Sequence, residues 1–144
     1  MNINLKGKNA LVGGSSKGIG RAIAEQLAAS GANVTVMARS EMVLSEVVNQ
    51  LTTNSGQKHQ YLVVDFSNFT DFTVKIKEYF KNNSVDILIN NTQGPSAGGA
   101  LEKSIDDYQA AFDLLFKCAV LTTNLALSHM QKKKMGTDHK CSIY

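Results

Sequence analysis

The sequence has few cysteines, little net charge and no long uninterrupted hydrophobic run. Its two cysteines, Cys118 and Cys141, form no Cys-x-x-Cys pair and no metal-ligand spacing, so we expect reduced thiols, no metal site and a cytoplasmic protein. No apolar segment follows a basic start, so no signal peptide is expected. Residues 114–130 come nearest to a membrane-spanning run, but polar residues interrupt them, and we expect no membrane partner.

The formal net charge is only +3, and the basic residues are scattered along the chain. A nucleic-acid surface needs clustered lysines and arginines, so a nucleic-acid partner is not expected. A hydrophobic content of 43% with 19% charged residues is typical of a globular protein. The length of 144 residues favours one domain, residues 1–144.

The most informative stretch runs from Leu11 to Gly20, where an apolar run ends in glycines and leads into a helical pattern. This order predicts a strand, a tight turn and a helix N-terminus whose exposed N–H groups bind phosphate. In the spacing Gly14-x-x-x-Gly18-x-Gly20, the first glycine turns sharply, the second lets a diphosphate approach and the third lets helix and strand pack closely. The alternative is a strand–helix turn without a ligand. A Walker-type phosphate loop is excluded because no Gly-Lys-Ser/Thr ends the stretch.

Apolar periodicity alternates between strand and helix patterns along the chain. It predicts strands at about 9–12, 33–38, 59–64, 85–90 and 140–144, and helices at about 19–30, after Ser40, within 70–82 and after Ser104. This alternation is typical of an α/β fold, a doubly wound parallel sheet of the Rossmann type with strand order 3-2-1-4-5. The ligand crevice would then lie where the carboxyl ends of the first and fourth strands meet.

We expect the first helix to pack through a face made of Ile19, Ile23 and Leu27, and the third through residues 72, 76 and 80. The lysines at 132–134 are expected to form a solvated helix end. The long helix after Ser104 carries an apolar seam that suits burial against the sheet and a subunit interface equally well, and we expect a homo-oligomer. The seam consists of Ile105, Tyr108, Phe112, Leu115 and Ala119.

The segment after the second strand distinguishes the two nicotinamide cofactors. An NAD site usually places an acidic residue there to bind the ribose 2′-hydroxyl, but this chain has Arg39 and Ser40. Arg39 can bind a 2′-phosphate in bidentate fashion, and Lys17 adds a second positive charge nearby. We therefore expect NADP(H) to be preferred over NAD(H). The alternative is that Arg39 is an ordinary surface arginine.

Asp65 and Phe66 directly follow the third strand. Asp65 either accepts a hydrogen bond from the adenine amino group, with Phe66 bordering the ring, or caps the turn at residues 67–70. The complete set of expected cofactor-binding residues is Gly14, Ser15, Ser16, Lys17, Gly18, Ile19, Gly20, Arg39, Ser40, Asp65, Phe66 and Asn91.

Three motifs, in this order and spacing, resemble the short-chain dehydrogenase/reductase family: Gly14-Ser-Ser-Lys-Gly-Ile-Gly20, Val64-Asp65-Phe66-Ser67 and Asp86-Ile-Leu-Ile-Asn-Asn-Thr-Gln-Gly94. The chain looks most like members related to 3-oxoacyl-[acyl-carrier-protein] reductase. The resemblance implies hydride transfer between NADP(H) or NAD(H) and a small-molecule carbonyl or alcohol. It also implies that Asn90 and Asn91 stabilise the sheet and border the nicotinamide ribose.

The chain departs from the family pattern at several positions, including the segment Thr92-Gln93-Gly94, which is one residue longer than the usual Ala-Gly. Gly13 replaces a threonine that often ties the loop to the fourth-strand motif. Leu115 aligns with the asparagine that opens the long helix and holds a relay water, and we expect Leu115 to be core. A further difference is that the family's serine and Tyr-x-x-x-Lys pair would lie beyond Tyr144, so we expect only the N-terminal, cofactor-binding portion, ending before strands six and seven.

No catalytic residue is therefore assigned, and the 144-residue chain alone is expected to be inactive. The alternative function is a non-catalytic NADP(H)-binding sensor or regulatory module. A methyltransferase that uses S-adenosylmethionine shares a glycine-rich first turn, but Arg39 stands where such proteins normally have an acid.

Overall fold

The structure is a computed structural model that describes residues 2–92, 94, 97–136 and 142–144. Its sheet has five strands in the order β3-β2-β1-β4-β5, and every neighbouring pair is parallel. The predicted α/β class and strand order are thereby confirmed. The strands are β1 (Asn9–Gly13), β2 (Asn33–Ala38), β3 (Gln60–Val63), β4 (Ile87–Ile89) and β5 (Ser142–Ile143).

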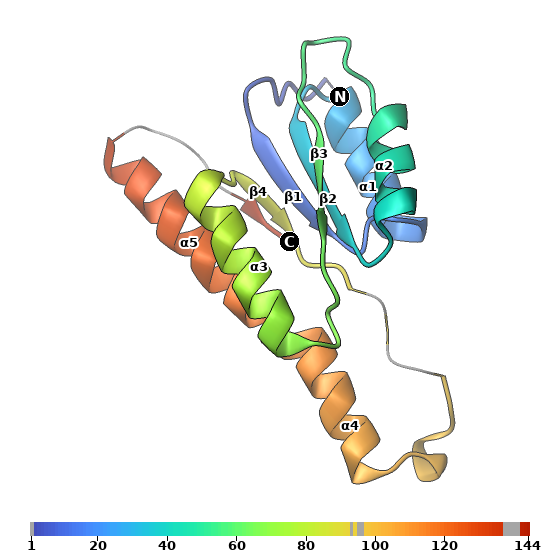
Figure 1. Cartoon of the computed structure of the whole chain (residues 1–144). Helices are drawn as coiled ribbons and strands as arrows, with labels where there is room; N and C mark the ends of the chain where they lie inside the picture. Colours follow the sequence, from blue (N-terminus) through green and yellow to red (C-terminus); the bar gives the residue numbers. More distant parts are fainter. Residues whose placement is uncertain (1, 93, 95–96, 137–141) are drawn as a thin grey trace.

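Helices cover both faces of this sheet (Figure 1). On one face, α1 (Gly18–Ala29) and α2 (Glu41–Gln50) enclose one apolar core with β1 and β2. On the other, α3 (Phe69–Asn82) and α5 (Cys118–Gly136) enclose a second core, in which Phe72, Ile76 and Phe80 are buried as predicted. A short 3-10 turn (Ala100–Glu102), α4 (Ile105–Phe112) and a π-helical turn (Asp113–Lys117) lie between β4 and α5.

The buried face of α1 differs from the predicted one. It consists of Gly20, Ala24 and Ala28, whereas Ile19 is 75% exposed. Small residues let the helix axis approach the strands closely, so the larger side chains are pushed to the flanks of the contact. The prediction is therefore wrong for Ile19, whereas Ile23 and Leu27 are partly buried and pack against this core.

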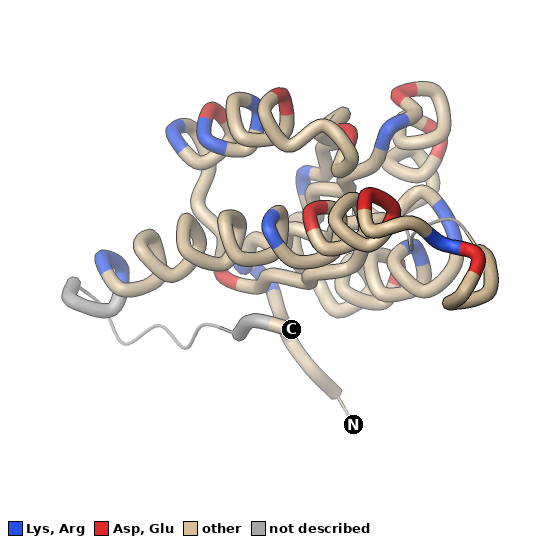
Figure 2. Tube along the Cα trace, turned by 90° about the horizontal axis from the view of Figure 1, so that it is seen from below, with Lys and Arg blue, Asp and Glu red and all other residues tan. Residues whose placement is uncertain are grey.

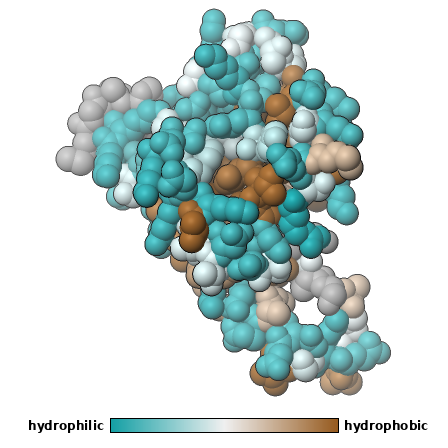
Figure 3. Space-filling model, viewed as in Figure 1, coloured by the Kyte–Doolittle hydropathy of each residue, from teal (hydrophilic) through white to brown (hydrophobic). Residues whose placement is uncertain are grey.

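The long helix also differs from expectation. Its apolar seam is largely uncovered in its first half, where Ile105, Phe112 and Leu115 are exposed, so Leu115 is not a core residue. Figure 1 shows α4 projecting beyond the sheet, and Figure 3 shows apolar atoms at the tip of this projection. In its second half the helix packs on the sheet through Cys118, Thr122, Ala126 and Met130, which are buried.

By length and composition alone, the helical span Ile105–Lys133 could cross a membrane, because an 18-residue window within it has a mean hydropathy of 1.5. Residues 114–130, the run that comes nearest to a membrane span in the sequence, lie within it. A core helix passes the same test, and the second half of this span packs against the sheet through buried residues. Charged residues of both signs are interspersed along the helices, as Figure 2 shows.

Lys133 ties the end of α5 to the sheet. Its Nζ lies 2.6 Å from Oδ1 of Asp86, whose side chain is 1% exposed. The other carboxylate oxygen of Asp86 accepts a hydrogen bond from the backbone N–H of Asn9, at 2.9 Å. The prediction of a solvated helix end is therefore wrong for Lys133, which pairs with a buried carboxylate and anchors α5.

Candidate cofactor site

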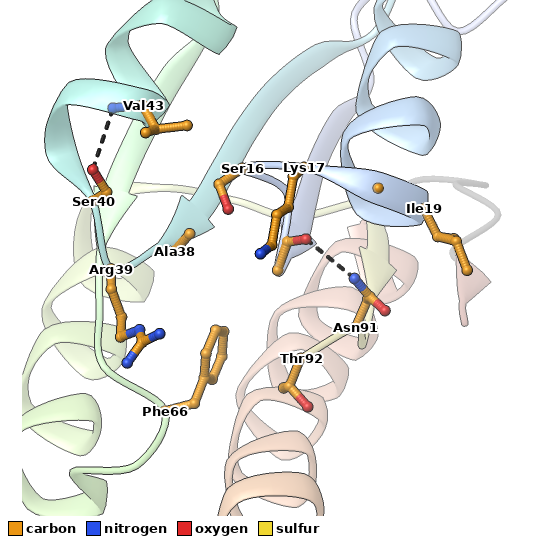
Figure 4. Close-up of a pocket in the computed structure, with 12 residues that line it drawn as sticks. Ser16, Lys17, Ile19, Ala38, Arg39, Ser40, Val43, Phe66, Asn91 and Thr92 are labelled. Carbon is orange, nitrogen blue, oxygen red and sulfur yellow. Dashed lines mark hydrogen bonds between the residues drawn. The ribbon is translucent and has the colours of Figure 1, made fainter. Parts of the chain in front are cut away.

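A cavity of about 590 Å³ opens at the carboxyl edge of the sheet, between the loop after β1, the end of β2 and the end of β4. This is the predicted crevice, and it forms because the winding of the sheet reverses between β1 and β4. Figure 4 shows the side chains that surround it. Its lining residues are Gly14, Ser16, Lys17, Gly18, Ile19, Ala38, Arg39, Ser40, Val43, Phe66, Asn91 and Thr92.

The glycines of the loop have the geometry that the sequence predicts. Gly14 and Gly18 adopt φ values of +55° and +61°, a region that side-chain-bearing residues rarely occupy. A Cβ at Gly20 would clash with the carbonyl oxygen of Gly14, which explains the close helix–strand approach. At Gly18 nothing lies within 4 Å of an added Cβ, so the backbone there borders open space. This bare backbone is a cradle into which a diphosphate fits.

The amino end of α1 has the character of an anion site. The first turn of α1 contains no acidic residue, and its N-cap, Lys17, makes no side-chain hydrogen bond to the helix. The first N–H groups of a helix lack acceptors within the helix and carry its positive partial charge. A phosphate group at this position would accept their hydrogen bonds, with the Lys17 ammonium beside it.

Two basic side chains and one aromatic ring project into the cavity from three segments. Lys17 comes from the glycine loop, Arg39 from the end of β2 and Phe66 from the segment after β3, as Figure 4 shows. Phe66 is 6% exposed and packs against Phe72 with ring centroids 5.3 Å apart, so its ring is held firmly. The two cationic side chains could bind phosphate groups, and the ring of Phe66 provides an apolar surface for a nucleotide base.

Asn91 closes the cavity on the β4 side. Its side-chain amide donates hydrogen bonds to the carbonyl oxygens of Gly13 and Gly14, at 3.3 and 3.2 Å. The preceding Asn90 donates from its amide to Oγ1 of Thr123 on α5, at 2.9 Å. The two asparagines therefore link the end of β4 to the glycine loop and to α5.

Ser15 is a correction to the predicted site. Its side chain is completely buried, donates to the carbonyl of Val12 at 2.8 Å and accepts from the N–H of Met37 at 2.9 Å. The hydroxyl thus joins β1 to β2 and cannot contact a cofactor in the cavity. Gly20 is also buried, and its role is the close packing described above.

Asp65 makes the turn-capping contacts of the second role that the sequence left open, and its contact with adenine stays a prediction. Its Oδ1 accepts hydrogen bonds from the N–H and the hydroxyl of Ser67, at 2.9 and 2.6 Å. These bonds hold the pKa of the Asp65 carboxyl below its usual value, and the nearby Arg39 guanidinium lowers it further. The carboxylate is therefore a turn cap beside the cavity.

The structure adds Ala38, Val43 and Thr92 to the residues around the cavity. Val43 lies in the first turn of α2, where its N–H donates to Oγ of the N-cap Ser40 at 3.4 Å. The sequence could have indicated Ala38 and Thr92 as lining residues, because they are adjacent to the predicted site residues Arg39 and Asn91 at the ends of strands. The assignment of all these residues to a cofactor stays a prediction.

The π-helical turn coincides with the position where the resemblance expects a helix-opening asparagine. The turn spans Asp113–Lys117 and has Leu115 at its centre. A π turn widens a helix and leaves backbone groups out of the regular ladder. The opening is therefore present, whereas the side chain that would hold a water there is apolar. Among the described residues no cluster of His, Cys, Asp or Glu could hold a metal ion.

The comparison with known proteins agrees with this geometry. A profile of the short chain dehydrogenase family matches residues 8–137. The chain belongs to this family. A fatty acyl-CoA reductase of Acinetobacter baylyi is 35% identical over 138 residues, which are 92% of this chain and 46% of that protein. A human protein named inactive hydroxysteroid dehydrogenase-like protein 1 is also 35% identical, over 90% of this chain and 40% of its own.

Solved structures of the family superimpose closely. The 3-oxoacyl (acyl-carrier-protein) reductase of Agrobacterium tumefaciens, crystallised with NADP bound, has a TM-score of 0.81 and 30% identity over 91% of this chain and 50% of that chain. The chain thus spans about half the length of the relatives it matches. It has the fold of an oxidoreductase family whose solved members include NADP(H) complexes.

Proposed function

We propose that residues 1–144 form the cofactor-binding half of an NADP(H)-dependent oxidoreductase that transfers hydride between NADP(H) and a carbonyl or alcohol. The observation that carries this proposal is that two basic residues, Lys17 and Arg39, line the cavity beside the glycine loop. NAD sites usually have a carboxylate after the second strand, but this position holds Arg39. A 2′-phosphate carries the charge that an arginine fork recognises.

Different residues of the cavity would bind different parts of the cofactor. The backbone at Gly14 and Gly18 and the N-terminus of α1 would hold the diphosphate, and Arg39, Lys17 and Ser40 the 2′-phosphate. Phe66 borders the space for adenine, and Asn91 with Thr92 borders the space for the nicotinamide ribose. When bound, the nicotinamide ring supplies the hydride. The chain's own residues bind and orient it.

A second candidate function is a non-catalytic NADP(H)-binding sensor or regulatory module. Leu115 favours it, because an apolar side chain at the π turn cannot hold a relay water. One relative carries the word inactive in its name, so a family member of this kind has a precedent. The presence or absence of a Tyr-x-x-x-Lys in the codons after Tyr144 distinguishes the enzyme from the sensor.

The substrate class and assembly are also proposed. The chain is similar to a 3-oxoacyl (acyl-carrier-protein) reductase and to a fatty acyl-CoA reductase, so we propose that its substrate is a small-molecule carbonyl or alcohol. We propose neither a nucleic-acid partner nor a membrane partner. A homo-oligomer would cover the exposed apolar residues of α4 and the π turn, including Ile105, Phe112 and Phe116. We place the protein in the cytoplasm, which cell fractionation tests.

The test is a binding titration of NADPH and NADH against the wild-type chain and two variants. Arg39→Ala should weaken NADPH binding by about 10- to 100-fold, the value of a charge-assisted hydrogen bond, and leave NADH unchanged. Arg21→Ala is the control, since Arg21 pairs with Glu25 on the exposed side of α1. Equal affinities of the wild type for both cofactors would contradict the proposal. Detectable NADPH-dependent carbonyl reduction by these 144 residues would contradict their role as a binding half.

A further inference from the structure

Glu41 is the first acidic residue after β2, two positions beyond Arg39. It opens α2, directly after the N-cap Ser40. An acid close behind the second strand is what an NAD site uses to bind the ribose 2′-hydroxyl. The same carboxylate would repel a 2′-phosphate. An NADP(H) preference therefore depends on where the Glu41 carboxylate is held.

The hydroxyl of Tyr61 holds it on the side of β3. The hydroxyl donates to Oε1 of Glu41 at 3.0 Å. Tyr61 pairs in register with Val36 of β2, so its side chain emerges on the face that α2 covers. Both groups are exposed, and the hydrogen bond to Glu41, followed by the negative charge of that carboxylate, raises the pKa of the Tyr61 hydroxyl. Among the described residues around the cavity, Arg39, Ser40 and Val43 flank Glu41, but Glu41 itself is not part of the lining.

A second carboxylate near Arg39 is held in the same manner. The hydroxyl and N–H of Ser67 bind Oδ1 of Asp65. Each acid beside the 2′-phosphate position is thus bound by a hydroxyl donor from its own neighbourhood. The Asp65 contact is local, two residues apart, whereas the contact of Tyr61 with Glu41 spans 20 residues and joins two elements.

We propose that Tyr61 is a specificity-determining positioning residue for the cofactor: by binding the Glu41 carboxylate toward β3, it keeps that carboxylate from the ribose 2′ position. The inference rests on the proposed function, because it presumes that the cavity binds the adenosine end of NADP(H). Tyr61 acts through Glu41 and touches no cofactor itself. Loss of its hydroxyl alone releases Glu41 to accept from a 2′-hydroxyl or to repel a 2′-phosphate.

The test measures the dissociation constants of NADPH and NADH for the 144-residue chain and four variants. Tyr61→Phe should lower the NADPH-over-NADH preference by roughly two- to tenfold, the range of one exposed hydrogen bond. Glu41→Gln should keep or increase the preference, and Tyr61→Phe added to Glu41→Gln should change it no further. Tyr108→Phe is the matched control, because it removes an exposed tyrosine hydroxyl that binds the carbonyl of Ala100, away from the cavity.

The dependence on Glu41 separates positioning from a general loss of structure. A structural defect would weaken both cofactors together and would persist in the Glu41→Gln background, which would overturn the inference. A wild type that prefers NADPH and a Tyr61→Phe variant with the same preference would also overturn it, leaving the proposed function intact. A wild type that binds both cofactors equally would overturn the proposed function and this inference together.

Discussion

The backbone carbonyl oxygen of Asn91 lies against the Cα of Gly13, where any side chain would have to begin. A Cβ at Gly13 would come closer than 3.0 Å to this oxygen, a distance that real Cβ atoms essentially never show. The side-chain amide of Asn91 also donates hydrogen bonds to the carbonyl oxygens of Gly13 and Gly14. The glycine that departs from the family pattern therefore permits a close contact between β1 and the end of β4.

Restoring the threonine of the family at this position should harm the protein. We expect Gly13→Thr to lower the free energy of unfolding by about 1–3 kcal/mol, the usual cost of overpacking, because the oxygen it meets belongs to backbone. NADPH affinity should fall with it, since the displaced Asn91 supports the glycine loop. Urea unfolding and a binding titration measure both effects. Gly94→Ala is the control, because nothing lies within 4 Å of a Cβ at Gly94. A threonine variant as stable as the wild type would show that the loop yields easily.

Loss of the ion pair between Lys133 and Asp86 should lower the free energy of unfolding more than loss of the neighbouring exposed Lys132. Lys133→Met removes the ammonium from the buried Asp86 carboxylate, which keeps its hydrogen bond from the N–H of Asn9 at 2.9 Å. Breaking a buried pair typically costs about 3–5 kcal/mol, but Lys133 is one-third exposed, so we expect about 1–3 kcal/mol. Lys132→Met, at an exposed position of the same helix end, should change stability by less than about 0.5 kcal/mol. Equal effects of the two substitutions, measured by urea unfolding, would refute the anchoring role.

The sheet order and the glycine loop could be predicted because both follow from local patterns. Alternating strand and helix periodicity, joined by right-handed crossovers, leaves few topologies. The positive φ angles of Gly14 and Gly18 likewise follow from residues that tolerate them. These features need no knowledge of distant contacts.

The remaining features depend on contacts between distant parts of the chain. Whether Ile19 or Ala24 faces the sheet is decided by how closely α1 approaches, which hydrophobic periodicity does not encode. The contact of Lys133 with Asp86 joins residues 47 positions apart. Leu115 was expected in the core because it is apolar, yet the half of the helix that carries it extends beyond the sheet.

Cys118 should be an unreactive thiol in the folded protein. It is 1% exposed, its Sγ donates to the carbonyl of Phe66 at 3.4 Å, and burial, with Asp113 and Asp65 adding to it, raises its pKa to about 11. In a Cys141→Ser background, where Cys118 is the only thiol, a disulfide reagent at pH 8 should react at least about 100-fold more slowly with native than with urea-unfolded chain. Similar rates in both states would contradict the burial of this residue.

The raised pKa of the Cys118 thiol also predicts that the free energy of unfolding falls at alkaline pH. The ordinary thiol value is 9.0, so an unfolded chain loses this proton at a lower pH than the native one, whose value is about 11. Stability from this group is complete below pH 9 and falls as the pH rises from 9 to 11. Unfolding free energies measured across this window should decline more steeply in the wild type than in Cys118→Ala. Parallel slopes would show that the thiol ionises alike in both states.

Ser15 and Ser16 are adjacent in the glycine loop, yet substitution of the first should lower stability and substitution of the second should lower cofactor affinity. Ser15→Ala removes the buried hydroxyl that joins Val12 to Met37, so the free energy of unfolding should fall by about 1–3 kcal/mol. The affinity of the folded fraction for NADPH should stay within about twofold of the wild type, because this hydroxyl does not reach the cavity. Ser16→Ala, which alters the cavity lining, should weaken NADPH binding and leave stability nearly unchanged. Urea unfolding paired with a titration of each variant measures both quantities, and a Ser15→Ala variant that loses affinity without losing stability would return this residue to the cofactor site.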